Sequence, residues 1–232
     1  PTRQYAIRRI EFDHWLLQRS AAPVHQHEVT TIRREGDAFI IDDDYRCRYL
    51  VGAGGTACPV YRTFFREQNP RNRTFQITTL EDEFPCDYSD PHCRLWFFDH
   101  GLPGYSWYVP KKGGYVNVGI GGKVEALRSR GETIQQHWDL FAEKLINRRL
   151  LPHLQPKPKG YTYHLRQPVH SMQSDNVFII GDSAGLATLD MGEGIGPAVE
   201  SGLRAARSIL SGKKYSLRFL SRYSIFDIIC SF

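Results

Sequence analysis

Short apolar runs alternate with polar turns in the first quarter of the chain. Apolar positions at near-helical spacing, with Asp13 as an N-cap or first-turn acid, predict a helix over residues 13–21. Residues 27–51 alternate β-prone runs around Gly36-Asp37, which is typical of a hairpin, and end on an apolar strand at residues 49–51. This pattern predicts two or three strands that lead into a glycine-rich turn.

The pattern changes between residues 72 and 122, where aromatic-rich runs are separated by Pro, Gly and Asp turn signals. These runs predict an antiparallel sheet of its own. Over residues 131–150 the apolar side chains recur at the helical period, which predicts a helix of about four turns. The apolar face of that helix consists of Ile134, Trp138, Phe141, Leu145 and Ile146.

The apolar run NVFIIGD, residues 176–182, predicts a buried strand that returns the chain to its first layer. A glycine loop follows, and then a helix that begins near Gly196 and Pro197, because proline in a first turn needs no donor. The order of strand, antiparallel block, helix, strand and helix predicts an α/β (α+β) fold in which the sheet is inserted into an α/β domain.

Composition narrows the function classes. The chain has 232 residues, 41% of them hydrophobic, so it can bury a core. The net charge is +5, but the 30 basic residues are scattered among 25 acidic ones, which argues against nucleic-acid binding. Five cysteines without a regular spacing argue against a disulfide framework and against a zinc site, so we predict no metal. CDYSDPHC, residues 86–93, is interpreted as a loop.

No apolar run reaches the length of a membrane span, and no signal-peptide pattern opens the chain. We therefore expect a cytoplasmic protein, with peripheral membrane association as an alternative. The first residue is proline rather than methionine, and we expect the chain to be a fragment of something longer.

Candidate chemistry gathers after the return strand. The carboxyl ends of strands in open α/β sheets are where ligands bind, and Asp182 is expected there. Its carboxylate can accept hydrogen bonds from a polyol, while glycines at 185, 192, 194 and 196 allow a flat ligand to approach the backbone. Free amides at the following helix N-terminus favour negative charge. The site suits a planar ring with a sugar-like arm, such as a reduced flavin.

IIGDSAGLATLDMGEGIGPAVESGLRAA, residues 179–206, resembles the GD motif and following helix of the flavin-dependent geranylgeranyl reductase family, within the p-hydroxybenzoate-hydroxylase-like flavoproteins. The resemblance implies that Asp182 contacts the ribityl chain of FAD. It also implies that the backbone at Gly194 and Ile195 approaches the isoalloxazine, with Gly181 and Gly192 in the same cofactor loop.

Two further stretches carry the resemblance. LVGAGGTACPVYR, residues 50–62, is similar to the group's motif near the FAD pyrophosphate; Gly55 and Arg62 keep its turn and charge, whereas Cys58-Pro59 departs from it. GYSWYVPKKGGYVNVGIGG, residues 104–122, resembles the reductases' Y-x-W-x-F-P signature with valine in place of phenylalanine. By that resemblance, a channel for an isoprenoid chain is lined by Tyr105, Trp107 and Pro110.

The resemblance implies an incomplete FAD-binding Rossmann-like domain with an inserted antiparallel substrate sheet. Residues 1–70 would form part of the FAD-binding domain, residues 71–165 the sheet and its helix, residues 166–212 the return segment, and residues 213–232 a C-terminal helix or tail. The strand, G-x-G-x-x-G turn and helix that bind the ADP half of FAD in such proteins do not occur in this sequence.

The implied function is an FAD-dependent oxidoreductase that reduces carbon–carbon double bonds of a prenyl chain by hydride transfer from reduced flavin. Its partners would be an apolar or prenyl-lipid substrate and an external electron donor. No spacing selects a proton donor among Tyr105, His100 and Cys58. One alternative is a flavin monooxygenase, halogenase or quinone-linked dehydrogenase on the same scaffold. Another is a truncated module that binds lipid or nothing and retains FAD weakly or not at all.

Overall fold

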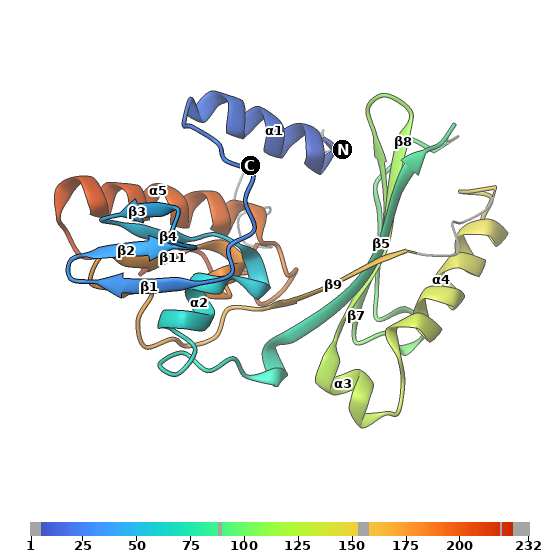
Figure 1. Cartoon of the computed structure of the whole chain (residues 1–232). Helices are drawn as coiled ribbons and strands as arrows, with labels where there is room; N and C mark the ends of the chain where they lie inside the picture. Colours follow the sequence, from blue (N-terminus) through green and yellow to red (C-terminus); the bar gives the residue numbers. More distant parts are fainter. Residues whose placement is uncertain (1–5, 88–89, 153–157, 219, 225–232) are drawn as a thin grey trace. The chain divides into compact units, whose positions relative to one another are not determined.

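The computed structural model describes residues 6–87, 90–152, 158–218 and 220–224, which divide into two compact units (Figure 1). The sheet unit comprises Pro1–Gln26 and Thr78–Tyr161, and the α/β unit comprises His27–Ile77 and Thr162–Phe232. The antiparallel block is thus inserted between two halves of the α/β unit, as the sequence predicts. The first helix, however, groups with the sheet unit, so the expected domain of residues 1–70 divides at Gln26.

Two small sheets form the α/β unit. The first has the antiparallel order β1 (Ile32–Glu35), β2 (Ala38–Ile41) and β3 (Tyr45–Cys47), and its first turn is the expected hairpin at Gly36, where φ is +60°. In the second sheet, β4 (Leu50–Gly52) pairs parallel with β11 (Val177–Ile179), and β10 (Gln173–Ser174) pairs antiparallel with β11. The parallel pair brings together two segments more than 120 residues apart in the chain, which only the tertiary fold could join.

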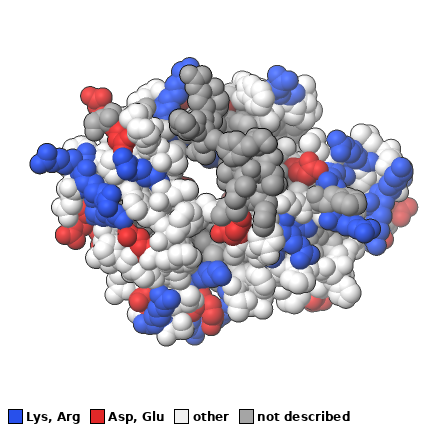
Figure 2. Space-filling model, turned by 180° about the vertical axis from the view of Figure 1, so that it is seen from behind, with Lys and Arg blue, Asp and Glu red and all other residues white. Residues whose placement is uncertain are grey.

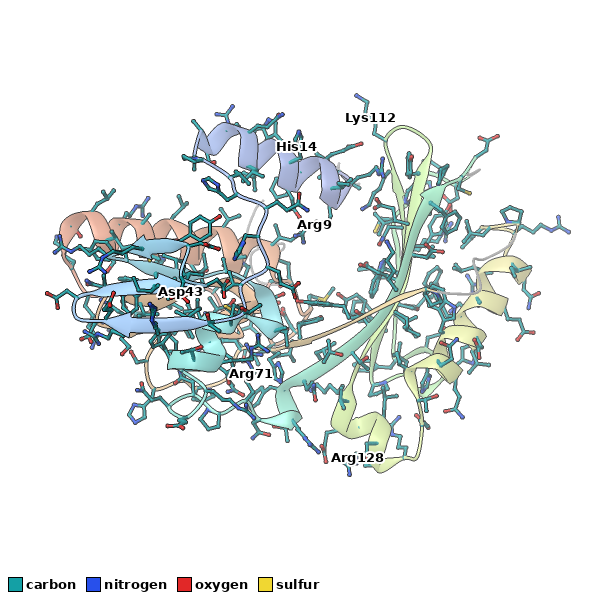
Figure 3. The ribbon with its side chains drawn as sticks, viewed as in Figure 1. Arg9, His14, Asp43, Arg71, Lys112 and Arg128 are labelled. Atoms are coloured by element: carbon teal, nitrogen blue, oxygen red, sulfur yellow. The ribbon has the colours of Figure 1, made fainter. Side chains whose placement is uncertain are left out.

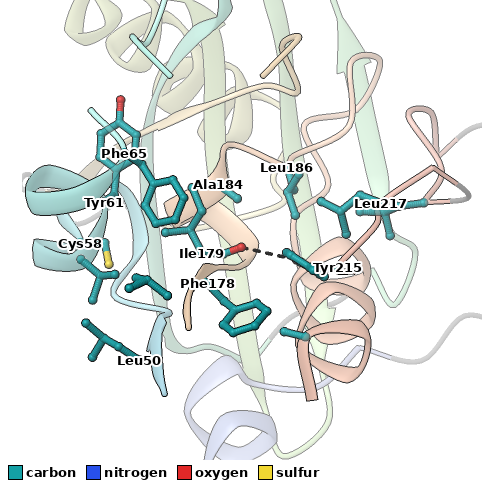
Figure 4. Packing of buried hydrophobic residues seen from close by; sticks show 14 of the residues in the cluster. Leu50, Cys58, Tyr61, Phe65, Phe178, Ile179, Ala184, Leu186, Tyr215 and Leu217 are labelled. Carbon is teal, nitrogen blue, oxygen red and sulfur yellow. Dashed lines mark hydrogen bonds between the residues drawn. The ribbon is translucent and has the colours of Figure 1, made fainter. Parts of the chain in front are cut away.

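Helices and short turns lie around the parallel pair. They are η1 (Gly55–Ala57), α2 (Pro59–Phe64), η4 (Gly181–Ala184) and α5 (Ile195–Ser211). A further short turn, η2 (Arg73–Phe75), precedes the strand at Gln76. The core around the parallel pair contains Leu50, Phe65 and Phe178 (Figure 4). Tyr215 joins this core, and its hydroxyl donates to the Ile179 carbonyl over 3.4 Å.

The sequence predicts a helix or a tail after α5. Residues 213–218 and 220–224 are not helical, so the described part of this segment is a tail. Residues 225–232 lie outside the described residues. This tail is part of the core, because Tyr215, Leu217 and Leu220 are buried in the same cluster. Burial raises the pKa of the Tyr215 hydroxyl above its ordinary value.

The sheet unit is built on five strands in the order β6 (Arg94–Phe97), β7 (Gly104–Lys111), β8 (Tyr115–Lys123), β5 (Gln76–Pro85) and β9 (Lys159–His164). The β6–β7 and β7–β8 pairs are antiparallel, which confirms the predicted antiparallel sheet. In the middle of β7 and β8 alternate side chains are buried on one face, namely Ser106, Tyr108, Val116, Val118 and Ile120. That face packs against helix α4, and the alternate residues lie on the opposite face.

Helix α4 (Ile134–Asn147) begins with a capping box formed by Thr133 and Gln136. Trp138, Phe141 and Leu145 of the predicted apolar face are buried. Ile146 is 43% exposed, so its assignment to that face is wrong. Successive helical residues are about 100° apart, and Leu145 already occupies the position toward the sheet.

Helix α1 (Arg9–Ser20) begins four residues earlier than the sequence predicts. Asp13 is therefore neither the N-cap nor a first-turn acid, and its carboxylate instead accepts a hydrogen bond from the Arg9 guanidinium one turn earlier, over 3.1 Å. No residue of α1 is buried. A third helix of this unit, α3 (Val124–Ser129), and the turn η3 (Asp99–Gly101) complete it.

Basic side chains lie in several separate groups with acidic ones between them on the face shown in Figure 2. This distribution agrees with the scattered charge of the sequence. No helix in the described part of the chain is long and apolar enough to cross a membrane.

Candidate functional site

The first turn of the site follows β4 and depends on close packing. A Cβ on Gly52 would lie 2.7 Å from the Val60 Cβ and 2.9 Å from the Cys58 sulfur, so only glycine fits at the end of this strand. Gly55 has φ +69°, a conformation that favours glycine, and it begins η1. The predicted glycine turn is therefore present, with α2 directly after it.

The second turn follows β11 and is attached to α5. Gly181 has φ +55°, and its amide donates to the Ser201 hydroxyl over 3.0 Å. A Cβ on Gly181 would lie 3.1 Å from the Ala198 Cβ, so the backbone of η4 approaches the helix closely. Ser201 also donates to the Ala198 carbonyl over 3.0 Å. These contacts fix η4, and with it Asp182, against α5.

Asp182 lies within η4 rather than at the last position of the strand, and it is half-buried. One carboxylate oxygen is 3.2 Å from the point where a Cβ on Gly194 would lie. The fold thus brings Asp182 next to the N-cap of α5, as the sequence predicts, and Ile195 beside it is 40% exposed. Aspartate, glycine and the first helical backbone groups form one accessible surface, which we name the Asp182 cradle.

The helix N-terminus is more neutral than the sequence predicts. The Gly196 amide donates to the Glu193 carboxylate over 2.8 Å, and the Ala198 amide donates to the Gly194 carbonyl. Pro197 has no amide hydrogen. The Ile195 amide remains without an intrahelical acceptor at this end. Glu193 therefore offsets part of the positive dipole that was expected to face the ligand.

Not every glycine of the loop leaves free space for a ligand beside the backbone. A Cβ on Gly192 would lie 2.4 Å from the Tyr163 hydroxyl oxygen, so the chain's own tyrosine fills that space. Gly192 has φ +63° and Gly185 has φ +62°, which explains both as turn residues. Packing and backbone conformation within the chain therefore account for Gly185 and Gly192 without a ligand, and their use by a flat ligand stays a prediction. A Cβ on Gly202 of α5 would meet Ile180 at an ordinary 3.6 Å, so no steric need explains that glycine.

Arg71 is the residue of this region that the sequence did not reveal. Its guanidinium donates to the Ser183 carbonyl over 3.0 Å and to the Thr56 carbonyl, and so links η4 to η1. It also stacks over the ring of Tyr61 on α2, 3.8 Å from the ring centroid. Figure 3 labels Arg71 in the view of the whole chain. Arg62, the predicted site arginine, is exposed on α2, and no contact among the described residues ties it to the Asp182 cradle. No motif distinguishes Arg71 within its polar stretch.

Beneath η4 lies a cavity of about 10 Å³, which is room for about one water molecule. Two buried polar atoms belong to residues that line it, Ser183 Oγ and His164 Nδ1, and neither has a hydrogen-bond partner among the described residues. Burial lowers the pKa of His164 to about 4, and the nearby Arg71 charge adds to this shift. His164 is therefore neutral at physiological pH.

Tyr105 and Trp107 lie on β7 and share the face opposite α4. Both are half-buried, and their ring centroids are 5.7 Å apart. Phe97 on β6 continues the row, with its ring 5.5 Å from that of Tyr105. We call Phe97, Tyr105 and Trp107 the aromatic row. Strand alternation puts Pro110 on the other face, so the structure does not group it with the other two predicted substrate residues.

The three candidate proton donors differ in their surroundings. Cys58 is 1% exposed and belongs to the core of the α/β unit, which removes it as a group that touches substrate. His100 lies in the turn η3 with φ +48°, and its side chain is exposed. Tyr105 is the member of the three that lies on the aromatic row. Within the interpreted loop sequence, Asp90 accepts hydrogen bonds from His92 and Arg94, which lowers the pKa of its carboxyl to about 2.

Comparison with known proteins finds relatives of similar sequence and of similar structure. No family model matches the chain. An uncharacterised protein of Methanosarcina barkeri is 32% identical over 217 residues, which cover 90% of this chain and 53% of the relative. Digeranylgeranylglycerophospholipid reductase 2 of Methanothermobacter thermautotrophicus is 31% identical over 242 residues, which cover 96% of this chain and 60% of the relative. These relatives support the resemblance of the chain to the geranylgeranyl reductase family.

The chain spans only part of its relatives' length, between 53% and 60% of the two just described. Among solved structures, a geranylgeranyl bacteriochlorophyll reductase-like protein of Thermoplasma acidophilum matches with a TM-score of 0.64 and 20% identity, over 88% of this chain and 53% of that one. A flavin-dependent halogenase matches with a TM-score of 0.62 and 17% identity, over 89% and 41%. These likenesses confirm the expected fold, which different reactions share.

Proposed function

We propose that this chain contributes flavin-binding and substrate-binding residues to an FAD-dependent oxidoreductase. This enzyme would reduce carbon–carbon double bonds in a prenyl chain. The observation that carries the proposal is the Asp182 cradle, where a half-buried carboxylate lies beside a helix-capping glycine. The relatives named as digeranylgeranylglycerophospholipid reductases support the prenyl substrate.

The residues of the cradle fit the ribityl arm and one edge of the isoalloxazine. Asp182 would accept hydrogen bonds from ribityl hydroxyls. The absent side chain of Gly194 leaves room for a planar ring beside the carboxylate, and the Ile195 amide can donate to a ring carbonyl. Glu193 already accepts from the Gly196 amide, so the helix end favours a neutral or weakly charged edge over a full anion.

Reduced flavin, when bound, would supply a hydride to one alkene carbon, and the neighbouring carbon would take a proton. The chain's own part is to hold and orient. Arg71 and Ser201 keep η4 in place through backbone groups, which fixes Asp182. In the sheet unit, the aromatic row offers an apolar surface with the polar tips of Tyr105 and Trp107, which suits an unsaturated hydrocarbon chain. The proposed partners are an external electron donor, which would reduce the flavin, and a prenyl-lipid substrate. A protein that acts on such a lipid would associate peripherally with a membrane.

A test on the purified chain records its visible absorption after incubation with FAD, and its action on a prenyl chain with reduced flavin and without oxygen. Flavin bands at near-stoichiometric amount and saturation of the prenyl chain are the expected results. Products that need oxygen would instead indicate a monooxygenase or halogenase on this fold. A chain that takes up no FAD under any condition would favour the truncated module.

A further inference from the structure

We propose that Asn117 and Gly119 of β8 are positioning residues that keep the indole of Trp107 packed flat against the sheet. The position of the indole then determines how much space the aromatic row leaves for the prenyl chain. The inference rests on the proposed function for the identity of the occupant. The position of the indole itself rests on contacts within the sheet unit.

Gly119 leaves the space that the indole occupies. It lies directly opposite Trp107 in the β7–β8 pair. A Cβ on Gly119 would lie 2.1 Å from Cζ2 and 2.5 Å from Cε2 of the indole, far closer than any real contact. The backbone of Gly119 does not have a positive φ, so its conformation does not require glycine. The missing side chain is explained by the tryptophan that lies over it.

Asn117 fixes the other side of the ring. Its side-chain oxygen accepts a hydrogen bond from the Trp107 Nε1–H over 2.7 Å. Asn117 is two residues from Gly119 and therefore on the same face of β8. One residue thus binds the pyrrole N–H while the other makes room for the benzene ring, which restricts the indole to one orientation.

The orientation matters because Trp107 ends the aromatic row. Its ring is 5.7 Å from Tyr105, which in turn lies 5.5 Å from Phe97, so three rings form a continuous apolar surface. An indole released from β8 would rise from the sheet and narrow the space above it. Asn117 and Gly119 would then act on chain binding through Trp107 without touching the chain.

The experiment labels the four tryptophans of the whole chain with 5-fluorotryptophan and follows their ¹⁹F resonances. The Trp107 resonance is assigned by its loss in Trp107→Phe. Asn117→Leu removes the acceptor and should move this resonance alone, whereas Asn117→Asp keeps an acceptor and should leave it near the wild-type position. Gly119→Ala should move it as well. Circular dichroism checks that each variant is folded.

Binding of a C20 prenyl alcohol, dispersed in mild detergent, gives the second readout. Asn117→Leu should weaken it about three- to tenfold, in line with one neutral hydrogen bond, and Asn117→Asp should restore it. In a Trp107→Phe background Asn117→Leu should have no further effect. An unmoved Trp107 resonance in the leucine and alanine variants, or an equal loss of binding in the phenylalanine background, would overturn the inference. If the wild-type chain binds no prenyl alcohol, the proposed function fails, while the resonances still decide how the indole is held.

Discussion

Replacing Asp182 with alanine tests the cradle most directly. The carboxylate is half-buried beside Gly194, so a hydrogen bond from a ribityl hydroxyl would be only partly screened by water. Hydrogen bonds to a charged group contribute about 1.5–3 kcal/mol, and we expect FAD to bind about 10- to 150-fold more weakly to Asp182→Ala. Asp182→Asn keeps the shape and one acceptor, so its loss should be smaller, about 0.5–1.5 kcal/mol.

Gly194→Ala is the matched variant on the other side of the cradle. Its φ of −119° suits alanine, so the fold should tolerate the change at a cost below about 1 kcal/mol. The new Cβ would lie 3.2 Å from the Asp182 oxygen and fill the space left for the ring. FAD affinity should therefore fall while the thermal midpoint stays close to that of the wild type.

Quenching of flavin fluorescence during titration measures the FAD affinity of each variant. Thermal unfolding serves as the control for a general loss of structure. If wild-type protein binds FAD and all three variants bind it within about twofold of wild type, the carboxylate and glycine do not contact the cofactor. The reasoning about the cradle would then be refuted.

Three further outcomes are expected from the α/β unit. Arg71→Met should lower the free energy of unfolding by about 1–3 kcal/mol, because it leaves the Ser183 and Thr56 carbonyls without their donor. Unfolding in urea measures this loss, and an unchanged midpoint would contradict it. Gly52→Ala should cost a similar amount through overpacking against Val60, whereas Gly36→Ala, with open space around it, measures the strain of a positive φ alone. The pKa of His164 is about 4 in the folded state and about 6.5 when unfolded, so between these values only the unfolded chain gains the proton and stability falls as the pH is lowered from 6.5 to 4. His164→Gln should flatten that part of the pH–stability curve, and an unaltered curve would show that other groups cause it.

Local patterns in the sequence identified most elements of the fold. The hairpin at Gly36, the aromatic strands, the amphipathic helix α4 and the buried strand β11 all have a clear period or turn signal. The errors lie at element ends and at neighbouring apolar residues, as with α1 and Ile146, because single positions at a boundary carry little periodic signal.

For the candidate site, the sequence determined that an aspartate and a glycine-capped helix follow a buried strand, since these features are contiguous in the chain. Only the tertiary structure decided which glycines face open space, because Gly192 meets Tyr163 from a distant strand while Gly194 meets Asp182. It also decided that Arg71 rather than Arg62 lies beside η4. Such pairings join segments far apart in the chain and depend on packing in three dimensions, which no local spacing records.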